Sequence, residues 1–159
     1  MTLMLVFSRG IGKSIQALTM LAIIRIEKDF NTCPSIVVCP ASLLLHWSDE
    51  VQKFFPPQLL SPVRIMKQSD FMNTIQNASS ASVCLLSYDM LRREMSRTHA
   101  SSLREQLWEL VVLDEAHLIK NPLTETAKCI FQLRGKHRIA LTGTPIQNQV
   151  TYDVCNIVI

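Results

Sequence analysis

The sequence contains few charged residues and no long apolar run, and each shortage excludes a class of protein. Charged residues make up 18% of the 159 residues and hydrophobic residues 48%, which is typical of a globular domain rather than a disordered chain. No stretch approaches the roughly 20 apolar residues of a membrane-spanning helix. The apolar residues 1–7 lack the basic flank and cleavage site of a secretory signal. We therefore expect a soluble, intracellular, single-domain protein without a membrane partner.

Two further patterns are missing, namely a zinc-binding arrangement of cysteines and a strong charge. The five cysteines include Cys33 and Cys39, but no second pair follows at the spacing of a zinc site. Most of the cysteines lie in apolar runs, which favours buried thiols in a reducing compartment. The net charge of +3 permits contact with phosphates but does not require it.

Short apolar runs alternate with segments of helical periodicity, which predicts an α/β fold with a parallel sheet flanked by helices. The expected strands are residues 3–7, 35–39, 63–66, 83–86, 110–113 and 138–141. Helices are expected from residue 13 to 26, from 42 to 54 with Ser42 as the N-cap, and from 124 to 133 closed by Gly135. Residues 92–104 are expected to form a solvated helix and connection. There is no internal repeat.

A glycine-rich segment, Gly10-Ile11-Gly12-Lys13-Ser14, lies between the first expected strand and the first helix. This is the context of a phosphate-binding loop, in which glycines allow backbone amides to approach phosphates. Lys13 would reach the β- and γ-phosphates, and the Ser14 hydroxyl would bind magnesium. The full pattern requires a glycine where this chain has Phe7, so a plain strand–turn–helix stays an alternative. The shorter Gly-x-Gly-Lys-Ser order fits helicase-like ATPases.

The most informative stretch is the apolar run 110–113, which ends in Asp114 and Glu115 and continues with Ala116 and His117. Such a run predicts a strand buried on both faces, and its carboxyl end would lie in the crevice where open α/β sheets bind ligands. Asp114 would hold magnesium, and Glu115 would orient or deprotonate the attacking water. His117 could sense the γ-phosphate or couple it to a second site. The alternative is a solvated loop cap, which the phosphate-loop motif earlier in the chain disfavours.

A third polar segment, residues 141–148, contains Thr142, Gly143 and Thr144 after the last expected strand. Hydroxyls at a strand end can link a nucleotide pocket to a polar partner by hydrogen bonds. Composition alone leaves an ordinary proline-containing turn as the alternative.

Together these motifs resemble the first ATPase lobe of the Swi/Snf-type DNA translocases, within helicase superfamily 2. The resemblance rests on residues 10–16, 38–44 with Trp47 and Glu50, 86–89, 114–121 and 141–148. Two details separate this family from ordinary RNA helicases: the Ile-Lys-Asn after the acidic motif and the Pro-Ile-Gln-Asn after the threonine motif. The resemblance implies a RecA-like, P-loop NTPase fold.

The resemblance also implies a cofactor and a role for each matched residue. ATP would be bound by Gly10, Gly12, Lys13, Ser14, Gln16, His117, Thr142 and Thr144. Lys13, Asp114 and Glu115 would carry hydrolysis, and magnesium would be held by Ser14 and Asp114. Residues 40–42 and 87–88 would lie along the backbone of duplex DNA, where contacts position a protein without reading sequence. The implied localisation is nuclear. A weaker likeness over residues 46–54 points to the branch that strips TATA-binding protein from DNA, so that protein and nucleosomes are candidate partners.

The sequence departs from the family pattern near both ends. Phe7-Ser8-Arg9 replaces an acidic pair and a methionine, and only nine residues precede Gly10, too few for the upstream segment that contacts adenine. We therefore expect a partial first lobe over residues 1–148, a divergent tail over 149–159, and no second lobe on this chain.

These departures leave two functional interpretations. The first is an ATP-dependent DNA translocase or remodelling enzyme. The alternative is a catalytically weak fragment that binds nucleotide, DNA or protein. A metabolic P-loop kinase is disfavoured, because the threonine–glycine–threonine segment has no purpose there. We expect weak magnesium–nucleotide binding that depends on Lys13, with little DNA-stimulated hydrolysis.

Overall fold

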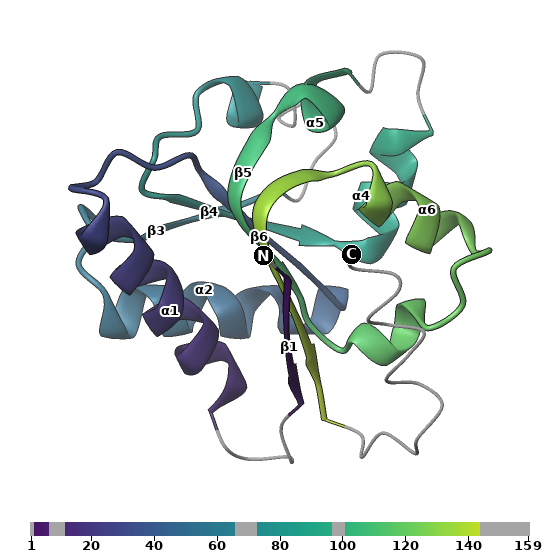
Figure 1. The fold of residues 1–159 in the computed structure, drawn as a ribbon, viewed down its shortest axis with the longest axis horizontal. Coiled ribbons are helices and arrows are strands. Elements are labelled where there is room, and N and C mark those ends of the chain that lie inside the picture. Colours follow the sequence, from purple (N-terminus) through teal and green to yellow (C-terminus); the bar gives the residue numbers. More distant parts are fainter. Residues whose placement is uncertain (1, 7–11, 66–72, 97–100, 144–159) are drawn as a thin grey trace.

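Six parallel strands form one sheet in the computed structural model (Figure 1). The structure describes residues 2–6, 12–65, 73–96 and 101–143. In sheet order, the strands are β1 (Thr2–Val6), β6 (Arg134–Thr142), β5 (Leu107–Leu113), β2 (Ser35–Cys39), β4 (Ser82–Ser87) and β3 (Ser61–Arg64). All pairings are parallel. The predicted α/β class and parallel sheet are therefore confirmed.

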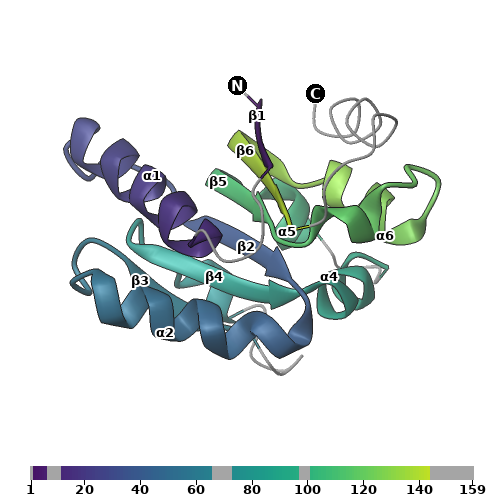
Figure 2. The same cartoon turned by 90° about the horizontal axis from the view of Figure 1, so that it is seen from below.

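Helices cover both faces of the sheet (Figures 1 and 2). The core on one face includes α1 (Lys13–Glu27) and α2 (Leu44–Phe54). The core on the other face includes α4 (Tyr88–Met95), α5 (Ser101–Glu105) and α6 (Glu125–Phe131). Two short 3₁₀ turns complete the layers: η1 (Ala41–Leu43) before α2 and η2 (Ala116–Ile119) after β5. In the described part of the chain, no helix is long and apolar enough to cross a membrane.

The central strands explain why two cores form. All five residues of β2 are buried. Ile36 and Val38 belong to the core beneath α4 and α6, whereas Val37 and Cys39 belong to the core beneath α1 and α2. Side chains alternate between the faces of a strand, so a strand that is apolar at every position serves both cores.

Two local expectations were wrong. Ser42 does not cap a helix, because Pro40 starts a 3₁₀ turn and α2 begins only after Leu43, without a side-chain cap. Gly135 does not close α6; it lies in β6 opposite Trp108. A Cβ atom at Gly135 would lie 2.7 Å from the Val111 Cγ2 atom, so the missing side chain allows β6 to pass β5 at this point.

Of the connection expected over residues 92–104, the described residues 92–96 and 101–104 are less solvated than expected, because Glu94, Met95 and Leu103 are buried. Ser87 caps α4 by accepting a hydrogen bond from the amide of Met90, and the helix therefore starts before residue 92. Leu91 and Met95 on its inner side are buried in the core.

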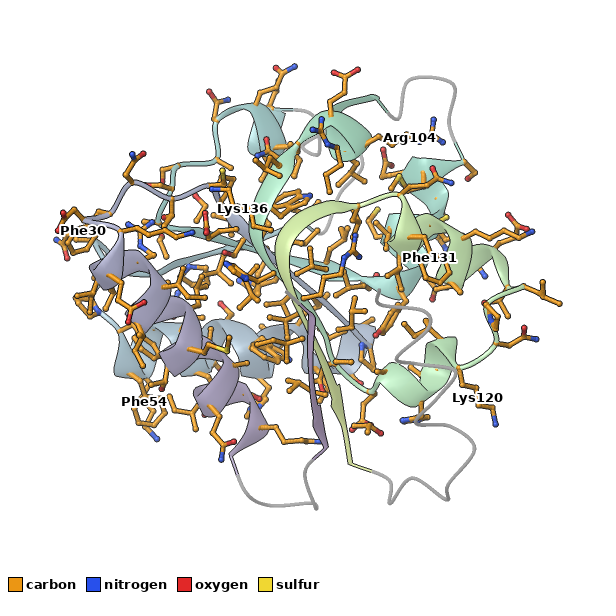
Figure 3. The ribbon with its side chains drawn as sticks, in the orientation of Figure 1. Phe30, Phe54, Arg104, Lys120, Phe131 and Lys136 are labelled. Carbon is orange, nitrogen blue, oxygen red and sulfur yellow. The ribbon has the colours of Figure 1, made fainter. Side chains whose placement is uncertain are left out.

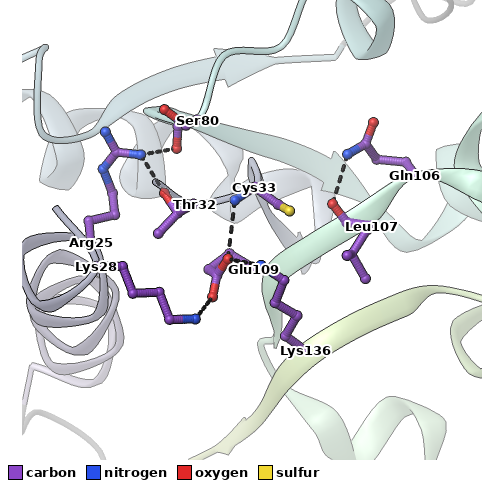
Figure 4. A network of polar contacts seen from close by, with 9 residues as sticks. All are labelled: Arg25, Lys28, Thr32, Cys33, Ser80, Gln106, Leu107, Glu109 and Lys136. Atoms are coloured by element: carbon purple, nitrogen blue, oxygen red, sulfur yellow. Dashed lines mark hydrogen bonds and ion pairs between the residues drawn. The ribbon is translucent and has the colours of Figure 1, made fainter. Parts of the chain in front are cut away.

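A charge network ties the amino ends of β5 and β6 to the end of α1 (Figure 4). The Glu109 side chain is completely buried, and it forms ion pairs with Lys28 and with Lys136, the latter at 2.8 Å. It also accepts a 3.1 Å hydrogen bond from the amide of Cys33. Burial alone would raise the pKa of this carboxyl, but these hydrogen bonds outweigh burial and lower it to about 2.

Candidate functional site

The carboxyl ends of the central strands meet at one edge of the sheet. Cys39 at the end of β2 pairs with Ser87 at the end of β4, and Val38 and Ala140 both pair with Leu113 at the end of β5. Residues that directly follow these strands are therefore neighbours. Ligands of open α/β sheets bind at this edge.

Gly12 directly precedes α1 at this edge, and its backbone adopts a conformation that favours glycine. Its φ is +64°, and its carbonyl accepts the first helical hydrogen bond, from the amide of Gln16 at 3.1 Å. No side chain caps this helix and no acidic residue lies in its first turn. The amides of the first turn, together with the helix dipole, are suited to a phosphate. Lys13 and Ser14 are the first two helical residues, as predicted, whereas Gly10 lies outside the described residues.

The acidic motif forms a sharp turn directly after β5. The Asp114 amide continues the sheet with a 2.9 Å hydrogen bond to the Val38 carbonyl. Glu115 then adopts a left-handed conformation with φ at +52°, and its carbonyl accepts a 2.9 Å bond from the Leu118 amide in η2. A left-handed residue other than glycine is uncommon, and such residues cluster at functional sites.

Lys13 and Glu115, which come from the two separate motifs, lie side by side. The Lys13 Nζ atom is 3.5 Å from the Glu115 Oε1 atom, and the two side chains keep 16% and 28% of their surface exposed. The other carboxylate oxygen, Oε2, lies 3.1 Å from the His117 Nδ1 atom. Glu115 is thus placed between a lysine and a histidine at a partly open position, where it can interact with both solvent and a ligand.

Asp114, in contrast, is only 4% exposed, and three of its oxygen atoms accept hydrogen bonds. Trp47 Nε1 donates to Oδ2 at 2.9 Å, and the Glu115 amide donates to Oδ1 at 2.9 Å. The Tyr88 hydroxyl donates to the main-chain carbonyl of Asp114 at 2.7 Å. Burial, and then the charge of Asp114, raise the pKa of Tyr88 well above its ordinary value, so this phenol stays a donor.

Sequence reasoning missed the roles of Trp47 and Tyr88 toward Asp114. The available signal was that an indole N–H or a phenol that becomes buried normally finds an acceptor. It also missed His46, whose Nε2 atom lies 3.4 Å from the Ser14 hydroxyl oxygen. His46 and Trp47 are neighbours in α2, so this helix reaches both expected magnesium ligands.

The remaining candidate residues are more scattered. Gln16 lies one turn along α1 from Gly12. Thr142 is buried at the end of β6, at the same edge of the sheet as Asp114. Thr144 lies outside the described residues.

The chemistry of two side chains suits magnesium. Ser14 and Asp114 offer a hydroxyl and a carboxylate, which are the hard oxygen ligands that magnesium prefers. Among the described residues, no three His, Cys, Asp or Glu side chains form a group that could hold a metal. Magnesium bound through one or two protein ligands plus phosphates needs no such cage.

Comparisons with known proteins identify the family of this chain. The model of the SNF2-related domain matches residues 2–158. Over 89% of its length, the chain is 32% identical to the TATA-binding protein-associated factor BTAF1 of Arabidopsis thaliana and 33% identical to the helicase SWR1 of Saccharomyces cerevisiae. It spans only 7% and 9% of the lengths of these two proteins.

A solved structure shares the fold. It is the SWI2/SNF2 ATPase core of Sulfolobus solfataricus in complex with double-stranded DNA, with a TM-score of 0.77 and 33% sequence identity. The match covers 98% of this chain and 30% of that one. The chain belongs to the SNF2-related domain family of helicase-like ATPases, and it corresponds to part of the N-terminal ATPase lobe.

Proposed function

We propose that this chain is the magnesium–ATP-binding lobe of a DNA translocase, with Lys13, Ser14, Asp114 and Glu115 at its centre. The observation that carries the proposal is the 3.5 Å contact between Lys13 and Glu115. Lys13 opens α1 and Glu115 lies in the turn after β5, so two distant parts of the sequence meet at the carboxyl edge of the sheet. A solvated loop cap after β5 would require no lysine partner from the phosphate-loop motif.

Each residue has a role that follows from its position. The Lys13 ammonium, at the first turn of α1, would bind the β- and γ-phosphates, assisted by the amides of that turn. Ser14 and Asp114 would bind magnesium, which neutralises charge on the phosphates. Glu115 is the more exposed of the two acids, so it is the one that can accept a proton from an attacking water. His117, whose Nδ1 atom lies 3.1 Å from Glu115 Oε2, would sense the γ-phosphate or couple it to a second site.

Duplex DNA is the proposed second ligand. The structural relative is an ATPase core in complex with double-stranded DNA, which supports this choice. Residues 40–42 and Ser87–Tyr88 lie at the ends of β2 and β4, next to the acidic motif. We place the DNA backbone along these segments, without sequence reading. The Thr142 segment would then couple hydrolysis to DNA movement.

We further propose a nuclear protein that remodels protein–DNA complexes. Relatives named as TATA-binding protein-associated factors and as SWR1 helicases support this class. TATA-binding protein and nucleosomes are the two candidate targets. The alternative function for this chain is nucleotide or DNA binding without turnover.

The nucleotide site is tested by titrating a fluorescent ATP analogue into the chain with magnesium present. We expect Lys13→Ala to weaken binding at least about tenfold, because it removes the cation that faces the phosphates. Lys53→Ala, at an exposed position near the end of α2, is the matched control and should bind as the unaltered chain does. Equal affinities for all three proteins would refute the site.

Hydrolysis is a separate question with a separate readout. Phosphate release is measured with and without duplex DNA, in the chain and in its Glu115→Gln variant. Turnover that rises with DNA and disappears in the variant supports the translocase. Lys13-dependent binding with no turnover supports the binding-only alternative for this chain.

A further inference from the structure

A concave site lies between α4 and α6, on the sheet face opposite α1 and α2. This α4–α6 cleft has a volume of about 400 Å³. Arg92 and Arg93 of α4, Arg104 of α5 and Lys128 of α6 contribute to its lining. None of the residues proposed for nucleotide or DNA binding lines it, so the cleft is separate from the ATP site.

The cleft has an excess of positive charge. Glu125 is its one acidic lining residue, and it already pairs with Lys128 at 2.7 Å on an exposed surface. Arg92 pairs with Asp89 at 3.1 Å, with both side chains at least half exposed. Exposed pairs of this kind contribute little free energy, so their cations can change partner easily. Arg93 has no acidic partner among the residues that the structure describes.

Arg104, labelled in Figure 3, lines the cleft, and two hydrogen bonds orient its side chain. Its Nε atom donates to the Gln132 side chain at 2.8 Å, and its Nη2 atom donates to the Met95 carbonyl at 2.9 Å. These bonds connect α5 to both α6 and α4. They leave both N–H groups of Nη1 available to a ligand. Because the guanidinium is already oriented, it loses little entropy when it binds a carboxylate.

The floor of the cleft differs from its rim. Met95 is 2% exposed and Cys129 7% exposed, and both belong to the core beneath α4 and α6. Burial raises the pKa of the Cys129 thiol above its ordinary value, so the thiol is neutral. A ligand that enters the cleft therefore meets cations first and then an apolar, polarisable surface, of the kind that methionine offers to varied partners.

We propose that the α4–α6 cleft is a docking site for an acidic peptide segment that also carries an aliphatic or aromatic side chain. Carboxylates of the peptide pair with Arg93 and Arg104 at the rim, and the apolar side chain packs on the aliphatic stems of these arginines, next to Met95. A nucleic-acid duplex fits less well, because a rigid duplex touches only the rim and gains nothing from the apolar floor. A flexible peptide reaches both. The proposal does not depend on ATP binding.

The test uses a fluorescein-labelled peptide of alternating glutamate and leucine, with a lysine–leucine peptide as the charge control. Fluorescence anisotropy gives the dissociation constant for the chain and for two variants. Arg93→Glu reverses the charge of the rim cation that has no acidic partner among the described residues, and we expect it to weaken binding at least about tenfold. Arg134→Glu makes the same change at an exposed position at the start of β6 and should leave binding unchanged.

A second readout locates the peptide. With ¹³C-methyl-labelled methionine, the Met95 signal, assigned through Met95→Leu, should shift on peptide addition. The signal of Met20, in α1, should not. Equal weakening by both charge reversals, or an unmoved Met95 signal, would overturn the proposal. Duplex DNA binding that is lost in Arg93→Glu, with no peptide binding, would overturn it in favour of a nucleic-acid site.

Discussion

The indole N–H of Trp47 donates a 2.9 Å hydrogen bond to the Oδ2 atom of Asp114, across 67 positions of sequence. Because the Glu115 amide binds Oδ1, each oxygen of this buried carboxylate has one donor. The carboxylate is therefore oriented by α2 and by its own turn. A preoriented ligand binds a metal more tightly than one that must be ordered on binding.

Trp47→Phe tests this orientation. The phenyl ring retains much of the packing but leaves Oδ2 of a buried acid without its donor. Loss of such a bond costs about 1–3 kcal/mol in the free energy of unfolding. We also expect a higher magnesium concentration at half-maximal nucleotide binding. Urea denaturation and a magnesium titration with a fluorescent nucleotide measure the two effects.

Trp108→Phe provides the control for that experiment. Trp108 is equally buried, but its Nε1 atom has no hydrogen-bond partner among the described residues. The change removes packing without breaking a bond, so it should cost less stability and leave the magnesium dependence unchanged. If both variants behave alike, the Trp47 bond does not orient Asp114.

Glu109 makes the stability of the fold depend on pH. Its pKa is lowered from the ordinary value of 4.5 to about 2, so the folded state favours the charged carboxylate. The stabilisation is complete above pH 4.5 and is lost as the pH falls toward 2. We expect Glu109→Gln to reduce the free energy of unfolding by about 2 kcal/mol at pH 7, an estimate that allows for the partial exposure of Lys28 and Lys136.

Urea denaturation at several pH values between 7 and 3 measures this difference. The difference in the free energy of unfolding between the unaltered chain and Glu109→Gln should become smaller below pH 4.5. Glu105→Gln, at an exposed position in α5, should show almost no difference at any pH. A difference for Glu109→Gln that stays constant down to pH 3 would contradict the assigned pKa.

Gly12 is expected to be intolerant of a side chain. Its φ of +64° costs an ordinary residue about 1–2 kcal/mol, and a Cβ atom would lie 2.9 Å from the Ile15 Cγ2 atom. Gly12→Ala should lower the free energy of unfolding by about that amount and weaken nucleotide binding. Gly12→Asn is the informative comparison, because asparagine adopts left-handed conformations more readily. A larger loss for asparagine than for alanine would exclude the backbone explanation.

The buried thiols should be inert. Burial raises the pKa of Cys84 to about 12, and burial with the nearby charge of Asp114 does the same for Cys39. Because the thiolate is the reactive form, iodoacetamide at pH 8 should not modify either residue in the folded chain. Partly exposed Cys33 should react. Peptide mapping after labelling distinguishes them, and modification of Cys39 as fast as Cys33 would show that the carboxyl edge opens.

The sequence predicted the central strands because their residues are apolar on both faces. Residues 35–39 and 110–113 carry this pattern, and the structure places both in the middle of the sheet. It did not predict that β6 begins at Arg134, because Arg-Gly-Lys-His has no apolar pattern of its own. Those residues extend only because β5 lies beside them, with Leu107 opposite Arg134 and Leu110 opposite His137.

The candidate site was predictable to the extent that its residues lie in local motifs. The roles assigned to Lys13, Ser14, Asp114 and Glu115 stay predictions, but the motifs do meet at one edge. The bonds from Trp47 and Tyr88 to Asp114 join distant parts of the chain. Neither spacing nor periodicity encodes such contacts, since they follow from how α2 and α4 pack on the sheet.

The position of β1 has a consequence for the order in which the chain folds. β1 lies at the edge of the sheet, and its one neighbour there is β6, the last described strand in the sequence. During synthesis on a ribosome, β1 therefore has no partner among the described strands until β6 has emerged. A strand without a neighbour is not stable in water. The contact between Lys13 and Glu115 therefore depends on a strand that β6 stabilises late, and the proposed ATP site should form only once β6 is in place.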